Sequence, residues 1–403
     1  AGGSTTTLET ATTFLNTGLV SFGNADADAT VVGGTLDTAT HTAATFLAGQ
    51  LTTEAANGAM DLSAATLNAN AALESGSGTI DLTTVTDGAG AFDLALQNGT
   101  GTGTVTATGA VTVDSLTTFA SAYAVDLQGG ATVTQDTNFL NDGALTLGSG
   151  AASTSTFVGG LDTTAVLGTV TLNGTIATTA TDMDFGAATL GSATTLQTSD
   201  GALTSTGAIT GAGQSLTLAA GTGAISLGDA TTSVGGVTTL TLNSSSATTF
   251  SGAVGAADIA LNGTTGLIDF TGAVTATNSL TTANQPYSVN FGAAANDSIA
   301  GDTTFLNAGS LTITGGGTTT FEGGVTATLP SVVNLQGSTV ASTTGGITLG
   351  DADTGLAVTD SSIVDGSPTG IITLGDITLA DAAQLTVGQG DANVISLRSV
   401  LGT

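Results

Sequence analysis

The chain has 403 residues, with 31 acidic side chains against one Arg and no Lys, and its formal net charge is −30. This charge repels nucleic-acid phosphates and anionic lipids, so we expect no nucleic-acid partner. No apolar run approaches the ~20 residues of a membrane helix, so we expect no membrane insertion. Cysteine is absent, which excludes disulfides and thiolate metal sites. Hydrophobic residues make up 40% of the chain, which favours an ordered fold over disorder.

A Phe-Leu-Asn motif occurs three times, beginning at Phe14, Phe139 and Phe305, and a Gly follows two residues after each Asn. The intervals are 139 − 14 = 125 and 305 − 139 = 166 residues, which differ by 41 residues, or about two units of roughly 20. A unit of this size also separates Phe250 from Phe270, since 270 − 250 = 20 and in both cases Gly-Ala-Val follows after one intervening residue. We therefore predict a repeat protein that grows by whole units, with the three motif Phe residues buried at equivalent positions.

Short segments of period-2 alternation dominate the chain, with Leu, Ile or Val alternating with Thr. Typical segments are 145–147, 170–172, 216–218, 240–242, 311–313 and 385–387. Gly and Asn follow many of them and supply the positive φ that corners need. Tandem sandwiches would need strands every 8–12 residues and a buried aromatic residue in each domain. The pattern instead predicts an all-β fold, a right-handed parallel β-helix (β-solenoid) with coils of roughly 20 residues.

The domain organisation follows from the repeats. Residues 109–163 match residues 272–328, and Tyr123 and Tyr287 stand at the same place in the two stretches. Only three Pro residues occur, and no Pro-rich or charged linker is visible. We predict one continuous solenoid over residues 1–403, with modules at approximately 1–108, 109–271 and 272–403.

Several segments resemble a known group of proteins. Residues 223–229, 240–243 and 270–275 look like bacterial surface and secreted β-strand-repeat proteins, which include filamentous-haemagglutinin-like exoproteins and autotransporter passengers. The resemblance covers most of the chain. It implies a right-handed parallel β-helix that serves outside the cell, or on the bacterial cell surface, as an adhesin, stalk or fibre.

The sequence contains no catalytic constellation. His41 is the only His, and no Gly-x-Ser-x-Gly context accompanies it. Paired carboxylates can cleave glycans, and three i, i+2 pairs occur: Asp26/Asp28, Asp182/Asp184 and Asp351/Asp353. Sugar sites usually offer aromatic platforms, however, and this chain has no Trp and two Tyr residues. We read these acids as solvated turn residues and predict that the protein is not an enzyme.

Calcium is the one cofactor that the acidic turns suit, because it prefers oxygen ligands. Asp26, Asp28, Asp351 and Asp353 are the candidate ligands. No segment matches the calcium loop with its closing Glu, and the nonapeptide calcium repeat is also missing. The default prediction is therefore a protein without a cofactor.

The C-terminal stretch 394–401 is among the most apolar in the chain and carries its only Arg. An open solenoid end is a template for another strand, so we expect copies of the protein to associate with one another. The residues predicted to take part are Ile395, Leu397, Arg398, Val400 and Leu401. The predicted function is an extracellular structural protein, a fibre or surface-layer subunit. The alternatives are an adhesin that binds a host or matrix ligand and a polysaccharide-degrading enzyme.

Overall fold

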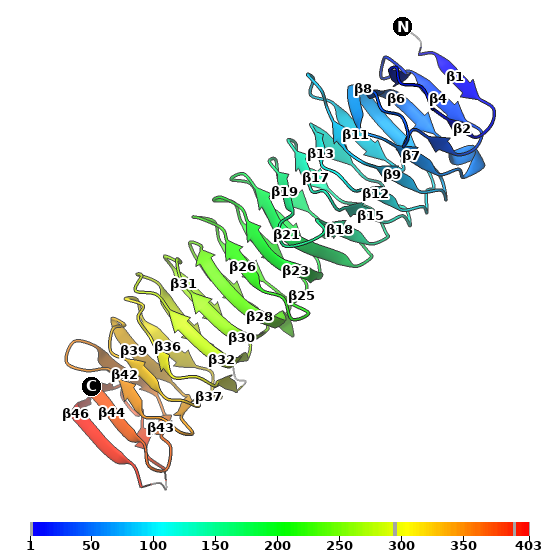
Figure 1. Ribbon diagram of the computed structural model, residues 1–403. Coiled ribbons are helices and arrows are strands. Elements are labelled where there is room, and N and C mark those ends of the chain that lie inside the picture. Colours follow the sequence, from blue (N-terminus) through cyan, green and yellow to red (C-terminus); the bar gives the residue numbers. More distant parts are fainter. Residues whose placement is uncertain (1–2, 293–295, 390–391, 403) are drawn as a thin grey trace. The chain divides into compact units, whose positions relative to one another are not determined.

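A computed structural model describes residues 3–292, 296–389 and 392–402. These residues form an all-β parallel solenoid of about 18 turns with roughly 22 residues in each turn, which confirms the predicted fold class (Figure 1). Helix is confined, in this part of the chain, to one 3-10 turn, η1 (Glu54–Ala56). No helix in it is long and apolar enough to cross a membrane.

The chain divides into two compact units, Ala1–Thr198 and Ser199–Thr403. The strands of the N-terminal unit are β1 (Thr5–Leu8), β2 (Thr12–Thr13), β3 (Val20–Phe22), β4 (Ala29–Val32), β5 (Leu36–Asp37), β6 (Thr45–Thr52), β7 (Met60–Leu62), β8 (Ala65–Glu74), β9 (Ile80–Leu82), β10 (Val85–Thr86), β11 (Asp93–Leu96), β12 (Val105–Ala107), β13 (Val111–Val113), β14 (Ser115–Thr117), β15 (Val125–Leu127), β16 (Ala131–Val133), β17 (Thr137–Asn138), β18 (Leu145–Leu147), β19 (Thr154–Phe157), β20 (Leu161–Asp162), β21 (Val170–Thr178), β22 (Met183–Phe185) and β23 (Ala188–Gln197).

The strands of the C-terminal unit are β24 (Leu203–Ser205), β25 (Ile209–Thr210), β26 (Leu216–Ala219), β27 (Ile225–Leu227), β28 (Thr232–Ser244), β29 (Thr248–Phe250), β30 (Ala253–Leu261), β31 (Leu267–Phe270), β32 (Val274–Thr282), β33 (Ser288–Phe291), β34 (Asp297–Ile299), β35 (Thr303–Thr304), β36 (Leu311–Thr314), β37 (Thr318–Phe321), β38 (Val325–Ala327), β39 (Val332–Gln336), β40 (Thr339–Ala341), β41 (Ile347–Leu349), β42 (Gly355–Asp360), β43 (Ser362–Asp365), β44 (Ile371–Leu379), β45 (Leu385–Val387) and β46 (Val394–Gly402).

Within each unit the strands stack in parallel columns, and the longer strands, such as β6, turn a corner and belong to two columns. In the N-terminal unit β2 pairs with β5, β5 with β7 and β7 with β9. Strands three apart in the chain pair where each coil has three strands, as in β12–β15–β18. Neighbouring coils therefore meet strand on strand, and backbone groups that face along the column are paired.

The core is one layer of inward side chains, as the alternation predicts. Leu145 and Leu147 are buried, whereas Thr146 between them is partly exposed. The same inward column contains Val105 and Val125 in the two preceding coils. β-branched and aliphatic residues suit this arrangement, because each inward side chain packs on its counterpart in the next coil.

The Phe-Leu-Asn motif ends a two-residue strand in each of its copies. The amides of Phe14, Phe139 and Phe305 donate to the carbonyls of Asp37, Asp162 and Thr326, one coil further on. Phe139 and Phe305 are fully buried, whereas Phe14, in the first coil, is half-buried. The predicted burial is confirmed for two of the three rings.

The second half of the motif is a corner that holds the preceding coil. The Leu140 amide donates to the Thr118 hydroxyl at 2.8 Å, and Leu306 donates to Thr282 at 2.7 Å. The Nδ2 atoms of Asn141 and Asn307, both fully buried, reach the carbonyls of the Tyr residues of that coil, Tyr123 and Tyr287 respectively.

The Gly of the motif is required by close backbone approach. A Cβ on Gly143 would lie 2.3 Å from the Tyr123 carbonyl oxygen, and a Cβ on Gly309 would lie 2.3 Å from the Tyr287 carbonyl oxygen. No other residue fits without moving one coil away from the next.

Successive motif copies do not stand on the same column. In the N-terminal unit Phe14 follows β2, whose column runs through β5 and β7. Phe139 follows β17, which belongs to the column with β20 and β22. The first two motif copies therefore occupy different corners of the coil, and growth by whole units stays a prediction.

Candidate functional site

The last strand of the C-terminal unit presents an open edge. β46 pairs along its whole length with β44, and no other strand in the described chain pairs with it. All nine of its residues are exposed. A strand with one unpaired edge offers a row of N–H and C=O groups to another strand.

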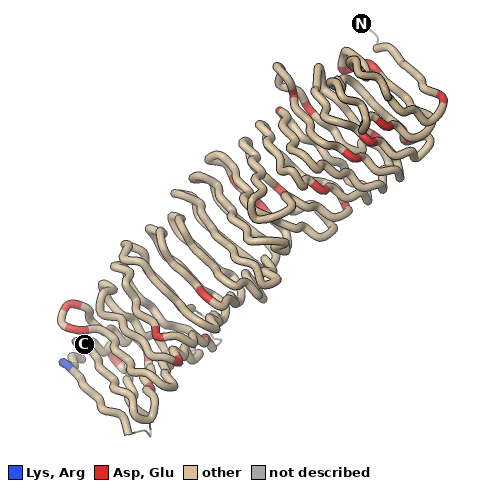
Figure 2. Tube along the Cα trace, viewed as in Figure 1, with Lys and Arg blue, Asp and Glu red and all other residues tan. Residues whose placement is uncertain are grey.

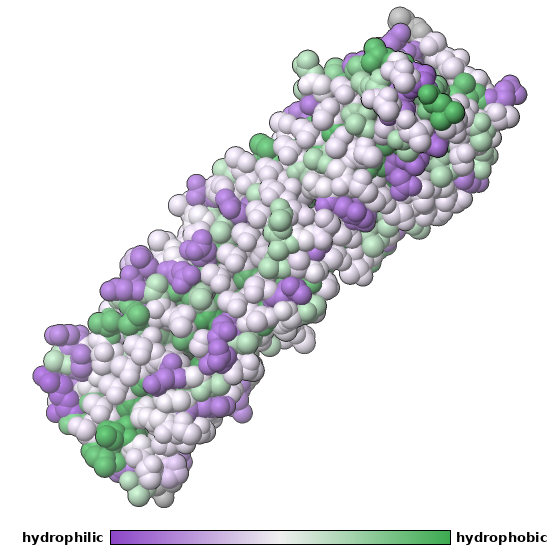
Figure 3. Space-filling model, viewed as in Figure 1, coloured by the Kyte–Doolittle hydropathy of each residue, from purple (hydrophilic) through white to green (hydrophobic). Residues whose placement is uncertain are grey.

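The apolar side chains of β46 split between the two faces of the strand. Ile395, Leu397 and Val400 continue the inward columns of Ile372, Leu374 and Ile377, which are buried. Leu401 stands over Thr378, on the outer face. The four apolar residues predicted for self-association are between 43% and 65% exposed, and Figure 3 shows hydrophobic surface at this end of the unit.

Arg398 lies on β46 and is the single cationic side chain of the sequence (Figure 2). Its Nε is 3.2 Å from the Oδ1 of Asp376, and both side chains are about half exposed. The Ser399 hydroxyl donates to the same carboxylate oxygen at 2.6 Å. An exposed ion pair of this kind contributes about 0.2–1 kcal/mol, so the guanidinium is available for a second carboxylate at little cost.

Of the candidate calcium ligands, Asp26 and Asp28 share one loop. Asp28 accepts hydrogen bonds from the amide and hydroxyl of Ser4 and from the Asn24 amide. The Ser4 amide, followed by the Asn24 amide, lowers the pKa of Asp28. Asp26 accepts from the Asn70 amide at 2.9 Å. Both carboxylates therefore hold backbone N–H groups of the first coils.

Asp351 and Asp353 stand on a loop of the C-terminal unit. Asp351 Oδ1 accepts from the amides of Asp353 and Thr354, each at 2.9 Å, and these two bonds, Thr354 first, lower the pKa of Asp351. In the described residues no three His, Cys, Asp or Glu side chains gather as a metal site would require. Calcium binding at these four Asp residues stays a prediction.

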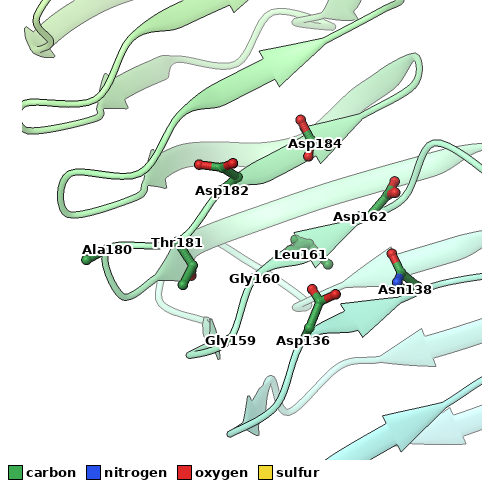
Figure 4. Close-up of a pocket in the computed structure, with 10 residues that line it drawn as sticks. All are labelled: Asp136, Asn138, Gly159, Gly160, Leu161, Asp162, Ala180, Thr181, Asp182 and Asp184. Atoms are coloured by element: carbon green, nitrogen blue, oxygen red, sulfur yellow. The ribbon is translucent and has the colours of Figure 1, made fainter.

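The structure brings together an acidic hollow that the sequence does not show. It has a volume of about 540 Å³ and lies in the N-terminal unit (Figure 4). Asn138, Asp162 and Asp184 stand in register on β17, β20 and β22, and Asp136 and Asp182 line the same hollow. None of its lining residues is aromatic, so it lacks the stacking platform of a sugar site. The sequence shows Asp182 and Asp184 as an i, i+2 pair of carboxylates, and the pairing of β20 with β22 places Asp162 beside Asp184.

A second carboxylate ladder begins beside the first coil. Thr13, Asp37, Asp61 and Asp81 occupy one outward column on β2, β5, β7 and β9. Burial, followed by the charges of Asp37 and Asp81, raises the pKa of Asp61. No basic residue lies on this column, so its charge is uncompensated within the ladder.

His41 has a structural position. It is buried, its Nε2 lies 2.5 Å from the Gly18 carbonyl oxygen, and its Nδ1 lies 3.4 Å from the Thr45 hydroxyl. The imidazole thus ties the first coil to the second, and no carboxylate is hydrogen-bonded to it.

Comparisons with known proteins find no counterpart: no protein-family description matches the chain, and no curated sequence or solved structure matches it. The fold is that of β-helix repeat proteins. The resemblance to bacterial surface proteins stays a prediction.

Proposed function

We propose that the protein is an extracellular structural protein, a fibre or surface-layer subunit that assembles with copies of itself. The observation that carries the proposal is β46, an apolar strand with one unpaired edge and nine exposed residues. Burying its inward side chains would contribute on the order of 1.5–3 kcal/mol each, and pairing its edge would satisfy the remaining backbone groups.

The composition supports assembly through stacking rather than through ion pairs. One cation stands against 31 acidic residues, so salt bridges between copies are limited to Arg398. Many outward positions, such as Thr146, carry neutral Thr, which adds no charge to the surface. Net charge of −30 opposes association at low ionic strength, and salt reduces this repulsion.

Sedimentation velocity and negative-stain electron microscopy of the purified chain test the proposal. We expect oligomers or filaments whose size grows with protein concentration and with NaCl concentration. Leu397→Glu should abolish this association, because it places a charge on the inward side of β46. The matched control is Leu167→Glu, which alters another exposed leucine (78% exposed) in a turn of the N-terminal unit. A monomer at high concentration and high salt would end the proposal.

The extracellular location rests on the resemblance to bacterial surface proteins, and surface proteolysis of intact cells tests it. Adhesion and polysaccharide cleavage are the rival functions, and no feature of the described residues specifically favours either of them.

A further inference from the structure

The N-terminal coil is open on the side opposite to its neighbour. Its strands β1, β2 and β3 pair with β4, β5 and β6, and no strand of the described chain covers their other edges. A hollow of about 340 Å³ lies there, lined by apolar side chains that include Leu8, Phe14, Leu19, Val20 and Phe22. An uncovered core of this kind is a surface for another coil.

The internal copies of the motif show which contacts a coil with this motif makes when another coil covers it. Phe305 is fully buried, and the preceding coil supplies a hydroxyl acceptor to the Leu306 amide. In the first coil the corresponding Leu15 is 76% exposed. Asn16 donates to Gly18 within its own turn, as Asn307 does to Gly309, but it lacks the further bond that Asn307 makes to Tyr287 of the preceding coil. The first coil thus has the motif of a covered coil, and no described residue of this chain covers it.

The first coil also matches, in spacing, the coil that contains Phe305. Leu8, Thr12 and Val20 are separated by 12 − 8 = 4 and 20 − 12 = 8 residues. Ile299, Thr303 and Leu311 are separated by 303 − 299 = 4 and 311 − 303 = 8. In both coils the three residues lie on three successive strands, β1 to β3 and β34 to β36.

The columns of the coil formed by β34, β35 and β36 end on the last coil of the chain. Strand pairing connects β34 to β45, β35 to the first half of β46, and β36 to the second half of β46. The residues in register are Asp297–Thr319–Val340–Val364–Val387, Thr303–Val325–Ile347–Ile372–Ile395 and Leu311–Val333–Leu356–Ile377–Val400. A coil of the same kind placed next in each column would continue the stack without a gap.

We infer that the C-terminal coil of one copy stacks on the N-terminal coil of a second copy, head to tail, with β45 on β1 and β46 on β2 and β3. This inference rests on the proposed self-assembly. The register places Val387 on Thr6, Ile395 on Thr12, Leu397 on Phe14 and Val400 on Val20. Leu397 then covers the motif ring that is half-buried in the free chain. Because the two surfaces differ, the contact repeats in one direction and builds an open filament.

Charge complementarity favours a second copy as the occupant. The same register places Ser396 on Thr13 of the second copy, and Asp37 follows Thr13 on the next strand. Arg398, two residues after Ser396, then lies about two strand spacings across and two residues along from Asp37, on the order of 12 Å between Cα atoms. The two side chains can span this separation. The sole cation of one copy thus meets the end of the uncompensated ladder of Asp37, Asp61 and Asp81 in the next.

Blocking each end separately tests the pairing. Leu397→Glu blocks the C-terminal end, and Thr6→Glu blocks the N-terminal hollow; both positions are exposed in the free chain, so the fold is retained. Each variant keeps one working end, so neither should assemble alone. An equimolar mixture should form dimers and nothing larger in sedimentation velocity, while Leu167→Glu should assemble like the unaltered protein.

The outcomes separate the two proposals. If the unaltered protein stays monomeric, self-assembly itself fails. If it assembles but Thr6→Glu alone assembles equally well, or the mixture of blocked variants stays monomeric, head-to-tail stacking is overturned while self-assembly stands.

The ion pair has its own test. Arg398→Gln and Asp37→Asn should each weaken assembly by up to about fivefold, and the double variant by no more than either one. Asp87→Asn, the matched loss of a carboxylate away from the contact, should not weaken it. Additive losses in the double variant would show that Arg398 and Asp37 do not meet.

Discussion

The most direct test of the repeat is the replacement of its aromatic residue in two environments. Phe139 and Phe14 stand at the same place in the same motif, and each makes one edge-on ring contact, with Phe157 at 6.0 Å and with Phe22 at 5.5 Å. They differ in burial, because Phe139 is fully buried and Phe14 is half-buried. The pair therefore isolates the contribution of a covering coil.

We expect Phe139→Ala to lower the free energy of unfolding by roughly 3–5 kcal/mol, the usual range for a fully buried Phe. The ring contact is common to both sites, so it cancels in the comparison. Phe14→Ala leaves a site that is already open to water, and its cost should be about half as large.

Urea denaturation followed by circular dichroism gives the two costs. Because each coil contacts only its neighbours, unfolding of a solenoid need not be a single transition. Hydrogen exchange at the amides of β18 and β20, which flank Phe139, should therefore be measured on the same variants. A cost below about 1 kcal/mol for Phe139→Ala, or equal costs at both sites, would refute the reasoning.

Three further predictions concern buried and crowded polar groups. Tyr123→Phe removes the hydroxyl that accepts a hydrogen bond from the Phe119 amide. It should lower the free energy of unfolding, measured in urea, by about 1–3 kcal/mol, which is more than replacement of a surface Tyr costs in another protein. Burial raises the pKa of Asp297, so its contribution to stability is fully present below about pH 4 and is lost as pH rises through the folded pKa; Asp297→Asn should flatten the fall of Tm over that range. Asp61→Asn should raise stability at pH 7 by up to about 1 kcal/mol in low salt, because it relieves burial of a charge between two like charges. Salt should remove only the like-charge part of this gain, and a loss of stability in low salt would contradict the prediction.

The alternation of Leu, Ile and Val with Thr was enough to predict the fold, because inward and outward positions of a stacked strand differ in the side chains they accept. The predicted coil length of roughly 20 residues is close to the observed length of roughly 22, and the Phe250–Phe270 interval comes from one of the shorter coils. Thr248 pairs with Ile268, 268 − 248 = 20 residues on, whereas Ile347 pairs with Ile372, 372 − 347 = 25 residues on. Corner loops vary in length without disturbing strand register, and the sequence does not mark where they do so.

Because corner loops vary in length, the sequence does not show which Asp residues line up in the acidic ladders. Asp162 and Asp184 are neighbours only because β20 and β22 pair in one register. Burial, followed by the charges of neighbouring carboxylates, raises the pKa values of Asp61 and Asp93. The pKa of Asp229 is instead lowered by turn amides, that of Thr232 first. A turn position offers N–H groups that offset a neighbour's charge, and only the backbone geometry reveals them.

The placement of the motif on different columns explains how such a chain can lengthen. In the N-terminal unit a coil turns three corners, and the motif is a corner device: its Phe fills the core, its Asn amide reaches a carbonyl of the preceding coil, and its Gly permits close approach. None of these contacts depends on which of the three corners is used, because each involves only the coil directly before or after. A duplicated segment therefore needs to restore register with its neighbours and need not contain a whole number of coils. Stacking of a new coil likewise depends only on the coil next to it. The new coil can therefore belong either to a further segment of the same chain or to a second copy of the chain. Growth of the chain and assembly between chains would thus use one and the same contact.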